Sequence, residues 1–160
     1  MSRLNSVIRR LSAQVNGLEW SLGPIEGLQG DVIEIGLGNG RTFDHLRELI
    51  KDRRIWVIDR NLQCHHSCVP PQDDFLQGDA DEMLAELARK GVQAALVHYD
   101  LGHGDNAHDQ AESARLSPLI DTVLAPGGVV VSGQPMVGLT QVRGPETVAI
   151  GRYFFYHKPR

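Results

Sequence analysis

The sequence predicts an α/β protein: a three-layer α-β-α fold built on a doubly wound, mostly parallel sheet with an antiparallel last strand. Three observations predict this class. Short runs such as 55–59 and 94–99 are largely apolar, as in strands buried on both faces of a parallel sheet. Segments of helical periodicity alternate with these runs, which is typical of βαβ units. The length of 160 residues is about that of one domain.

The predicted elements follow one another in a regular order. A basic amphipathic segment, 3–18, is expected to form a first helix that packs over the site, and the first strand is expected at 31–36. Gly91 is placed to end the third helix. The other elements are expected as a helix at 41–51, strands at 55–59 and 75–77, a helix at 80–90, a strand at 94–99, a helix at 107–124 and a strand at 129–132.

The C-terminal third is short for such a fold. Seven residues, GQPMVGL, separate the fifth strand from TQVRGPE, whereas a parallel crossover needs a dozen or more. We therefore expect an abbreviated end of the sheet and a long last strand, 147–156, that returns antiparallel at the edge. The whole chain, 1–160, is then expected to form one domain.

Composition and charge limit the classes of partner that are expected. The formal net charge is -4, which provides no long-range attraction to nucleic acid or anionic lipid. No apolar run approaches the roughly 20 residues of a membrane span, so no membrane partner is expected. Two cysteines do not make a disulfide framework, which favours a reducing compartment, the cytoplasm. The acid-poor segment 3–18, with three arginines, has a transit peptide as its alternative interpretation.

Glycines or carboxylates follow the predicted strands. In doubly wound sheets, ligands bind beyond the carboxyl ends of the strands, where the strand order reverses. The residues expected there are the turn from Gly36 to Gly40, the pair Asp59-Arg60, the step Gly78-Asp79-Ala80, and Asp100.

The glycine turn is suited to a ligand that approaches the backbone and the start of the next helix. A Walker phosphate loop has its two glycines five residues apart, before Lys-Ser/Thr. Here Gly36 and Gly40 are four apart and Arg41-Thr42 follows. A dinucleotide fingerprint requires glycine or alanine where this chain has Arg41. A structural turn without a ligand is the alternative for this stretch taken alone.

For each of two carboxylates, the sequence allows a role in ligand binding and an alternative role without a ligand. Asp59 lies 19 residues after Gly40 and can accept hydrogen bonds from both hydroxyls of a ribose; a solvated acid is the alternative. Asp79 can accept from the exocyclic amine of adenine while Ala80 leaves room for the ring. Asp79 is equally suited to be the N-cap of the following helix, and both roles are compatible.

Together these features resemble a known family. The pattern Glu34-x-Gly36-x-Gly38-x-Gly40, the later acids, the strand ALVHYD and the segment LAPGGVVV are similar to the successive motifs of class I, seven-strand S-adenosylmethionine-dependent methyltransferases. The resemblance covers about 31–132 and implies a Rossmann-like fold with S-adenosyl-L-methionine as cofactor. The cofactor-binding residues that it implies are Glu34, Gly36, Leu37, Gly38, Gly40, Asp59, Arg60, Asp79, Ala80 and Asp100. Glu34 and Asp100 are the candidates to meet the cofactor ammonium.

The loop DLGHGDNAHDQ after the fourth strand is expected to hold any general base, with Asp100 and His103 as first choices. Solvation of His103 in the loop is its alternative. The loop lacks the Asn/Asp-Pro-Pro-aromatic motif of relatives that methylate nucleobases or amides. With the acidic net charge, this favours a small-molecule acceptor over nucleic acid, in a shallow site or in one completed by a second subunit of a homodimer or higher homo-oligomer.

No metal is expected. In the segment CHHSC, from Cys64 to Cys68, four ligand-type side chains lie within five residues and cannot all reach one tetrahedral ion. Two other functions stay open at this stage: an NAD-type nucleotide-dependent enzyme on a similar sheet, and a protein that binds S-adenosylmethionine without catalysis.

Overall fold

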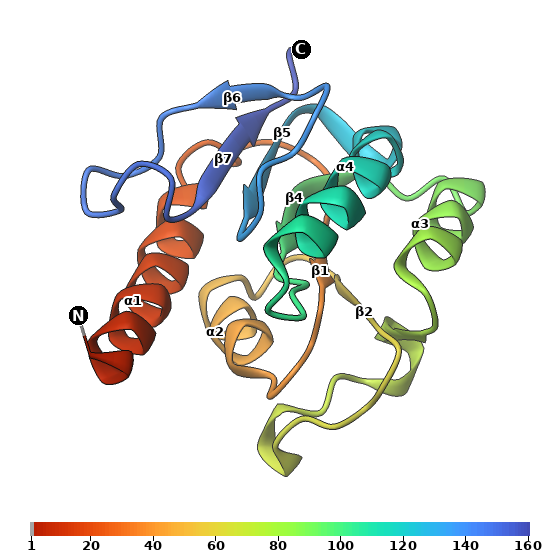
Figure 1. Ribbon diagram of the computed structural model, residues 1–160. Helices are drawn as coiled ribbons and strands as arrows, with labels where there is room; N and C mark the ends of the chain where they lie inside the picture. The colour runs from red at the N-terminus through yellow and green to blue at the C-terminus, as the bar shows by residue number, and fades with distance from the viewer. Residues whose placement is uncertain (1) are drawn as a thin grey trace.

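The computed structural model describes residues 2–160, which form a mixed sheet with helices on both faces (Figure 1). The strands are β1 (Asp31–Ile35), β2 (Ile55–Asp59), β3 (Phe75–Gln77), β4 (Ala94–Tyr99), β5 (Leu124–Ser132), β6 (Thr140–Val142) and β7 (Phe154–His157). The helices are α1 (Arg3–Ser21), α2 (Arg41–Leu49), α3 (Ala80–Arg89) and α4 (Asn106–Val123), with short 3₁₀ turns at η1 (His66–Cys68) and η2 (Gln72–Asp74).

The strand order in the sheet is β3-β2-β1-β4-β5-β7-β6. The first five strands in this order are parallel, and β7 pairs antiparallel with both β5 and β6. The predicted α/β, doubly wound fold with an antiparallel last strand is therefore confirmed. The chain reverses its winding direction between β1 and β4, so a ligand crevice is expected beyond the carboxyl ends of these two strands.

Two hydrophobic cores lie on opposite faces of the sheet. One is built from α1, α2 and one set of strand side chains, including Leu18, Phe43 and Leu46. The other is built from α3, α4 and the opposite set, including Leu84 and Ile120. Both cores are necessary because β1, β2 and β4 are buried along nearly their whole length.

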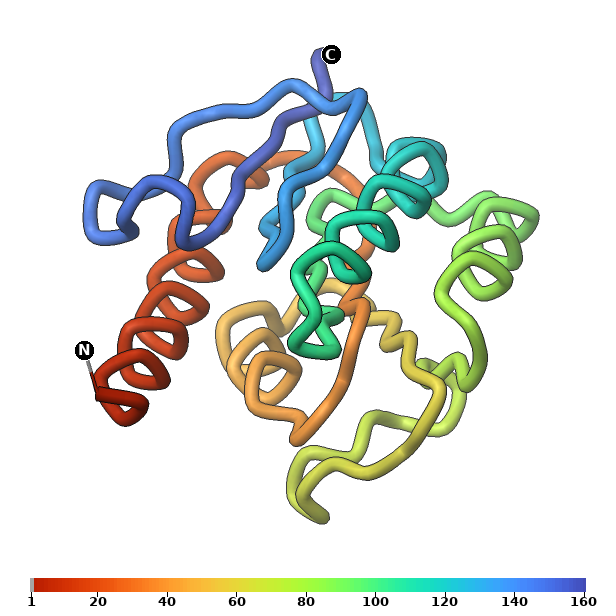
Figure 2. Tube along the Cα trace, viewed as in Figure 1, coloured from red at the N-terminus to blue at the C-terminus, as the bar shows by residue number. Residues whose placement is uncertain are grey.

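Helix α1 packs against the C-terminal strands, and Figure 2 shows the red N-terminal helix beside the blue end of the chain. The Trp20 ring meets Phe155 edge-on, with centroids 5.0 Å apart. Gly17 allows this close packing, because a Cβ there would lie 3.2 Å from the Phe155 ring. Within residues 2–160, we find no helix with the length and apolar character needed to cross a membrane.

The C-terminal part differs from the expected boundaries. The prediction of a long last strand at 147–156 was wrong. Residues Thr147 to Tyr153 form turns and an isolated bridge, and β7 begins at Phe154. Gly151 interrupts the run with a φ of 79°, a conformation that extended strands do not use. β7 also lies inside the sheet, because the short strand β6, which was not predicted, forms the edge.

The fifth strand also begins earlier than expected. β5 starts at Leu124 rather than 129, so the APGG segment belongs to the strand and not to the end of helix α4. The pairing with β4 jumps from Leu124 to Val129, which marks an irregularity where Gly127 adopts a φ of 83°.

Candidate cofactor and acceptor site

The turn between β1 and α2 has a backbone shape that requires glycine. Gly36, Gly38 and Gly40 adopt φ angles of 96°, 49° and 84°, in the left-handed region that side chains disfavour. Gly36 also lies against the start of the loop after β4, since a Cβ there would be 3.0 Å from the Asp100 carbonyl oxygen. The turn is thus shaped by its own glycines and packed against the neighbouring strand end.

Asp59, at the end of β2, holds this turn in place. Its Oδ2 accepts hydrogen bonds from the backbone N–H groups of Leu37 at 2.8 Å and Gly38 at 3.2 Å. Its Oδ1 accepts from the N–H of Asn61 at 2.9 Å. A carboxylate offers about four acceptor positions, so this side chain can still accept a bond from a ligand hydroxyl.

Two adjoining cavities flank Asp59, and they share Asp59, Leu101 and His103. The first has a volume of about 270 Å³. It is lined by Arg10, Leu11, Gln14, Gly36, Leu37, Gly38, Asn39, Arg41, Thr42, Asp59, Asp100, Leu101, Gly102 and His103. The second has a volume of about 330 Å³. It is lined by Ile58, Asp59, Arg60, Asn61, Gly78, Ala80, Leu101, His103 and Glu112.

The structure therefore brings most of the predicted residues together. The predicted residues that line one or both cavities are Gly36, Leu37, Gly38, Asp59, Arg60, Ala80, Asp100 and His103. Gly40 instead forms the N-cap of α2, where a Cβ would collide with the Cβ of Cys68. Asp79 occupies the N-cap position of α3 without a side-chain cap bond and pairs with Arg60 Nε at 2.5 Å, beside the second cavity.

The expected contact between Glu34 and the cofactor needs correction. Glu34 is fully buried in β1 and does not line either cavity. The Thr42 hydroxyl donates to its Oε1, and His98 Nδ1 lies 2.6 Å from its Oε2. Both carboxylate oxygens are therefore used inside the protein, and Glu34 can act on a ligand only through the groups that it positions.

A chain of buried polar groups runs from Glu34 to Asp100. His98 Nε2 lies 2.7 Å from the Tyr153 hydroxyl, which in turn donates to Asp100 Oδ1 at 3.3 Å. Gln14 on helix α1 donates to Asp100 Oδ2 at 2.8 Å. Asp100 is thereby held from two sides at the wall of the first cavity.

Protonation states follow from this chain. Burial lowers the pKa of His98, but the charge and hydrogen bond of Glu34, helped by Asp100, raise the pKa above its ordinary value. Burial, followed by the charges of Asp100 and Glu34, raises the pKa of Tyr153 well above its ordinary value. A doubly protonated His98 can donate to both Glu34 and Tyr153, and a neutral Tyr153 can then donate to Asp100.

His98 is expected to make stability depend on pH. Because its pKa is higher in the folded chain, the folded state binds more protons, and stability falls as pH rises above about 6.5, by up to ~1.4 kcal/mol per pH unit. Below that pH its contribution is fully present. Urea unfolding at about pH 6, 7 and 8 measures the slope. His98→Gln should remove this part of the slope, and an identical slope in both proteins would contradict the charged state of His98.

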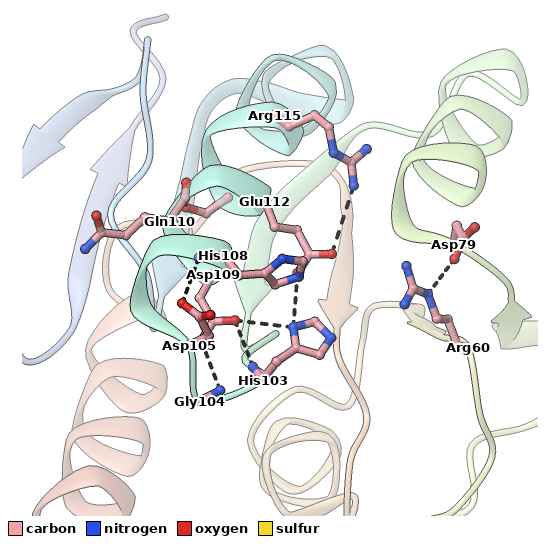
Figure 3. A network of polar contacts seen from close by, with 11 residues as sticks. Arg60, Asp79, His103, Gly104, Asp105, His108, Asp109, Gln110, Glu112 and Arg115 are labelled. Carbon is pink, nitrogen blue, oxygen red and sulfur yellow. Dashed lines mark hydrogen bonds and ion pairs between the residues drawn. The ribbon is translucent and has the colours of Figure 1, made fainter.

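The loop after β4 leads into a second polar cluster, shown in Figure 3. The backbone N–H groups of His103 and Gly104 donate to the two oxygens of Asp109 at 2.8 and 3.2 Å, and the His103 Nδ1 lies 3.3 Å from Oδ1. Burial raises the pKa of Asp109, but these bonds outweigh it and hold the pKa below its ordinary value. Asp109 thus fixes the loop that carries His103 to the junction of the cavities.

Several residues of the site were missed by sequence reasoning. Arg10, Gln14 and Tyr153 come from the two ends of the chain, and no local pattern connects them with the strand ends. Glu112 did have a signal, because it lies four residues after His108 on α4, and such a pair shares one face of a helix.

The comparisons with known proteins now decide the family. A protein family described as S-adenosyl-L-methionine methyltransferase matches residues 1–158. The chain belongs to this family. A crystal structure of an S-adenosyl-L-methionine methyl transferase from Silicibacter pomeroyi DSS-3 agrees: it is 39% identical, with 99% of each chain covered and a TM-score of 0.93. The resemblance noted in the sequence is thereby confirmed, and the protein is an S-adenosylmethionine-dependent methyltransferase.

More distant solved structures share the fold of this methyltransferase. Human methyltransferase-like protein 13, in complex with SAH, is 13% identical, with 98% of this chain and 81% of that chain covered and a TM-score of 0.55. Human N-acetylserotonin methyltransferase, in complex with SAM, is 14% identical, with 94% and 52% covered and a TM-score of 0.57. A comparison with curated proteins gave no match. The NAD-type and non-catalytic alternatives are not favoured by these findings.

Proposed function

We propose that this methyltransferase transfers the methyl group of S-adenosylmethionine to a small-molecule acceptor, with the cofactor extended across both cavities. The observation that carries the proposal is that Asp59, Leu101 and His103 line both cavities, at the carboxyl ends of β1, β2 and β4. One ligand can therefore reach from the first cavity into the second while its ribose lies beside Asp59. The adenine then lies near Ala80 and Arg60.

The donor set of the first cavity fits the methionine part of the cofactor. Asp100 presents a carboxylate, firmly held by Gln14 and Tyr153, that can accept a bond from the ammonium. Arg10 and Arg41 line the same cavity and can meet a carboxylate. The open backbone at Gly36 and Gly38 lets the ligand approach the turn closely.

When bound, the cofactor supplies a methyl group on a positively charged sulfur that leaves as a neutral thioether. The protein has to align the acceptor with the methyl group and exclude water. We assign the removal of the acceptor proton to His103, because it lies at the junction of the cavities and its ring is held beside Asp109. Asp100, which already accepts two hydrogen bonds, serves to position rather than to take the proton.

The size of the site and the net charge of the whole chain support a small acceptor. Each cavity lies near the lower end of the roughly 300–1,000 Å³ that small-molecule sites occupy, so little space is left beside the cofactor. The net charge of -4 gives no support to a nucleic acid substrate. We also place the protein in the cytoplasm, on the basis of its two free cysteines, and as a homodimer, on the basis of exposed Leu4, Val7 and Ile8 on α1.

A cell extract separated by size tests the acceptor class. When the protein is incubated with S-adenosylmethionine and the small-molecule fraction, we expect it to form S-adenosylhomocysteine. Formation of S-adenosylhomocysteine only with the nucleic acid or protein fractions would overturn the proposal. His103→Ala should lower the rate by about 10²-fold or more, because a general base contributes that much. Its affinity for S-adenosylhomocysteine should stay within a few fold, and His66→Ala, in the exposed η1 turn, serves as the control.

A further inference from the structure

Three side chains beside the second cavity are arranged as metal ligands. His103, His108 and Glu112 each offer one ligand atom, and these atoms all lie within 4.8 Å of one another. Figure 3 shows the two imidazole rings and the Glu112 carboxylate gathered between the β4 loop and the first turns of α4. The ring centroids of the two histidines are 4.9 Å apart.

Glu112 provides an independent sign of a missing cation. Its side chain is only 9% exposed, and its Oε2 has no hydrogen-bond partner. The side-chain nitrogens that approach this carboxylate are too distant for a hydrogen bond: His103 Nδ1 lies 3.8 Å from Oε2, and Arg115 Nη2 lies 4.0 Å from Oε1. A buried carboxylate oxygen without a donor is costly, and a bound cation would remove this cost.

The surrounding structure supports the two histidines. His108 and Glu112 are four residues apart on α4, so both project from the same face of the helix. Asp105 caps the helix by accepting from the backbone N–H groups of Ala107 and His108. Asp109 accepts hydrogen bonds from the backbone N–H groups of His103 and Gly104 and so holds the loop that carries His103.

We propose that His103, His108 and Glu112 bind a divalent transition-metal ion, with zinc as the best match to two imidazoles and one carboxylate. This set of three ligands is typical of sites that keep a coordination position open for water or substrate. Ligand atoms around such an ion are about 3.3–4 Å apart, so binding requires a small closure of the cluster. The exposed rings of His103 and His108 leave room for that movement.

This inference rests on the proposed function and refines it, because the ion would lie where His103 and Glu112 line the second cavity. An ion there lowers the pKa of a coordinated hydroxyl or thiol, so the acceptor class is an alcohol, phenol or thiol. The acceptor proton passes to solvent. The acceptor oxygen or sulfur then forms a bond to the methyl carbon while the carbon–sulfur bond of the cofactor breaks and its sulfur keeps the electron pair. With the ion bound, His103 serves as a ligand, and this role replaces the proton acceptance that we proposed above for the site without metal.

Cobalt(II), a visible probe for zinc sites, tests the proposal on the chelator-treated full chain. We expect about one equivalent of cobalt(II) to bind per chain and zinc to displace it. Visible absorption and calorimetry measure this binding. His108→Ala and Glu112→Gln should weaken binding by about 100-fold or more, and Asp109→Asn by about 10–100-fold, because Asp109 holds the loop that carries His103. His66→Ala should bind cobalt(II) as tightly as the unchanged protein. His66 belongs to a separate pair of exposed histidines, in which the ring centroids of His65 and His66 are 4.1 Å apart.

Two results would overturn the metal site. The first is the absence of binding, or binding unchanged in His108→Ala and Glu112→Gln. The second is binding that disappears in Cys64→Ser and persists in His108→Ala, which would place the ion at the CHHSC segment. Circular dichroism establishes that each variant is folded. Calorimetry with S-adenosylhomocysteine on the same samples separates this question from the proposed function, since a protein that binds the nucleoside but no cobalt loses only the metal site.

Discussion

Replacing Glu34 by alanine is expected to lower the free energy of unfolding by about 3–5 kcal/mol, because it leaves a buried charged partner without compensation. His98 is fully buried, and its Nδ1 lies 2.6 Å from Glu34 Oε2. The Thr42 hydroxyl, also buried, loses its acceptor in the same variant. Urea unfolding at neutral pH measures the change.

Glu48→Ala is the matched control for that experiment. Glu48 also forms an ion pair, with Lys51 at 3.3 Å, but both side chains are about two-thirds exposed, at 70% and 67%. Removing such a pair should cost less than about 1 kcal/mol. If Glu34→Ala lost no more stability than Glu48→Ala, Glu34 would not be the buried partner on which the chain from His98 to Asp100 depends.

The second large effect is expected for the cofactor. Asp59→Ala should weaken the binding of S-adenosylhomocysteine by at least about tenfold, because each hydrogen bond from a ribose hydroxyl to a carboxylate contributes on the order of 1.5–3 kcal/mol. The variant also removes the acceptor for the backbone N–H groups of Leu37 and Gly38, so the glycine turn loses its support. Isothermal titration calorimetry measures the affinity.

Two further variants make this result specific. Asp52→Ala removes an exposed acid just before β2, at the opposite end of the strand from Asp59, and should leave the affinity unchanged. Asp59→Asn keeps one side-chain oxygen as an acceptor, so its affinity for S-adenosylhomocysteine should lie between those of Asp59→Ala and Asp52→Ala. Equal affinity in Asp59→Ala and the unchanged protein would remove Asp59 from the binding site, whatever the family of the chain.

The buried chain from Glu34 to Asp100 connects the packed core of this methyltransferase with the wall of the first cavity. Its members come from β1, β4 and the turn before β7, and it ends on a carboxylate at the cavity wall. Gln14 of α1 binds the other oxygen of that carboxylate. A site built in this way is preorganised, since the position of Asp100 is set by the packed core and not by the ligand.

Local features were readable from the sequence alone. The bounds of β2, β3 and β4 agree with the expected strands, because continuous apolar runs have few other stable environments in a domain of this size. The glycines of the β1–α2 turn were readable because a left-handed φ is a local requirement that other residues meet at a cost. The two cavities lie where the topology of doubly wound sheets predicts a ligand crevice.

The tertiary structure decided which of these residues can reach a ligand. Glu34 belongs to the motif in sequence, but the fold turns it toward Thr42 and His98 and away from the cavities. Tyr153 was predicted to lie in a strand, but a turn at Gly151 brings its hydroxyl to Asp100, which is 53 positions earlier in the sequence. Such contacts depend on how distant segments pack together, whereas apolar periodicity and glycine backbone angles are properties of neighbouring residues. The sequence therefore determined the fold class and the family motifs, and only the packed structure determined the chemical surroundings of each site residue.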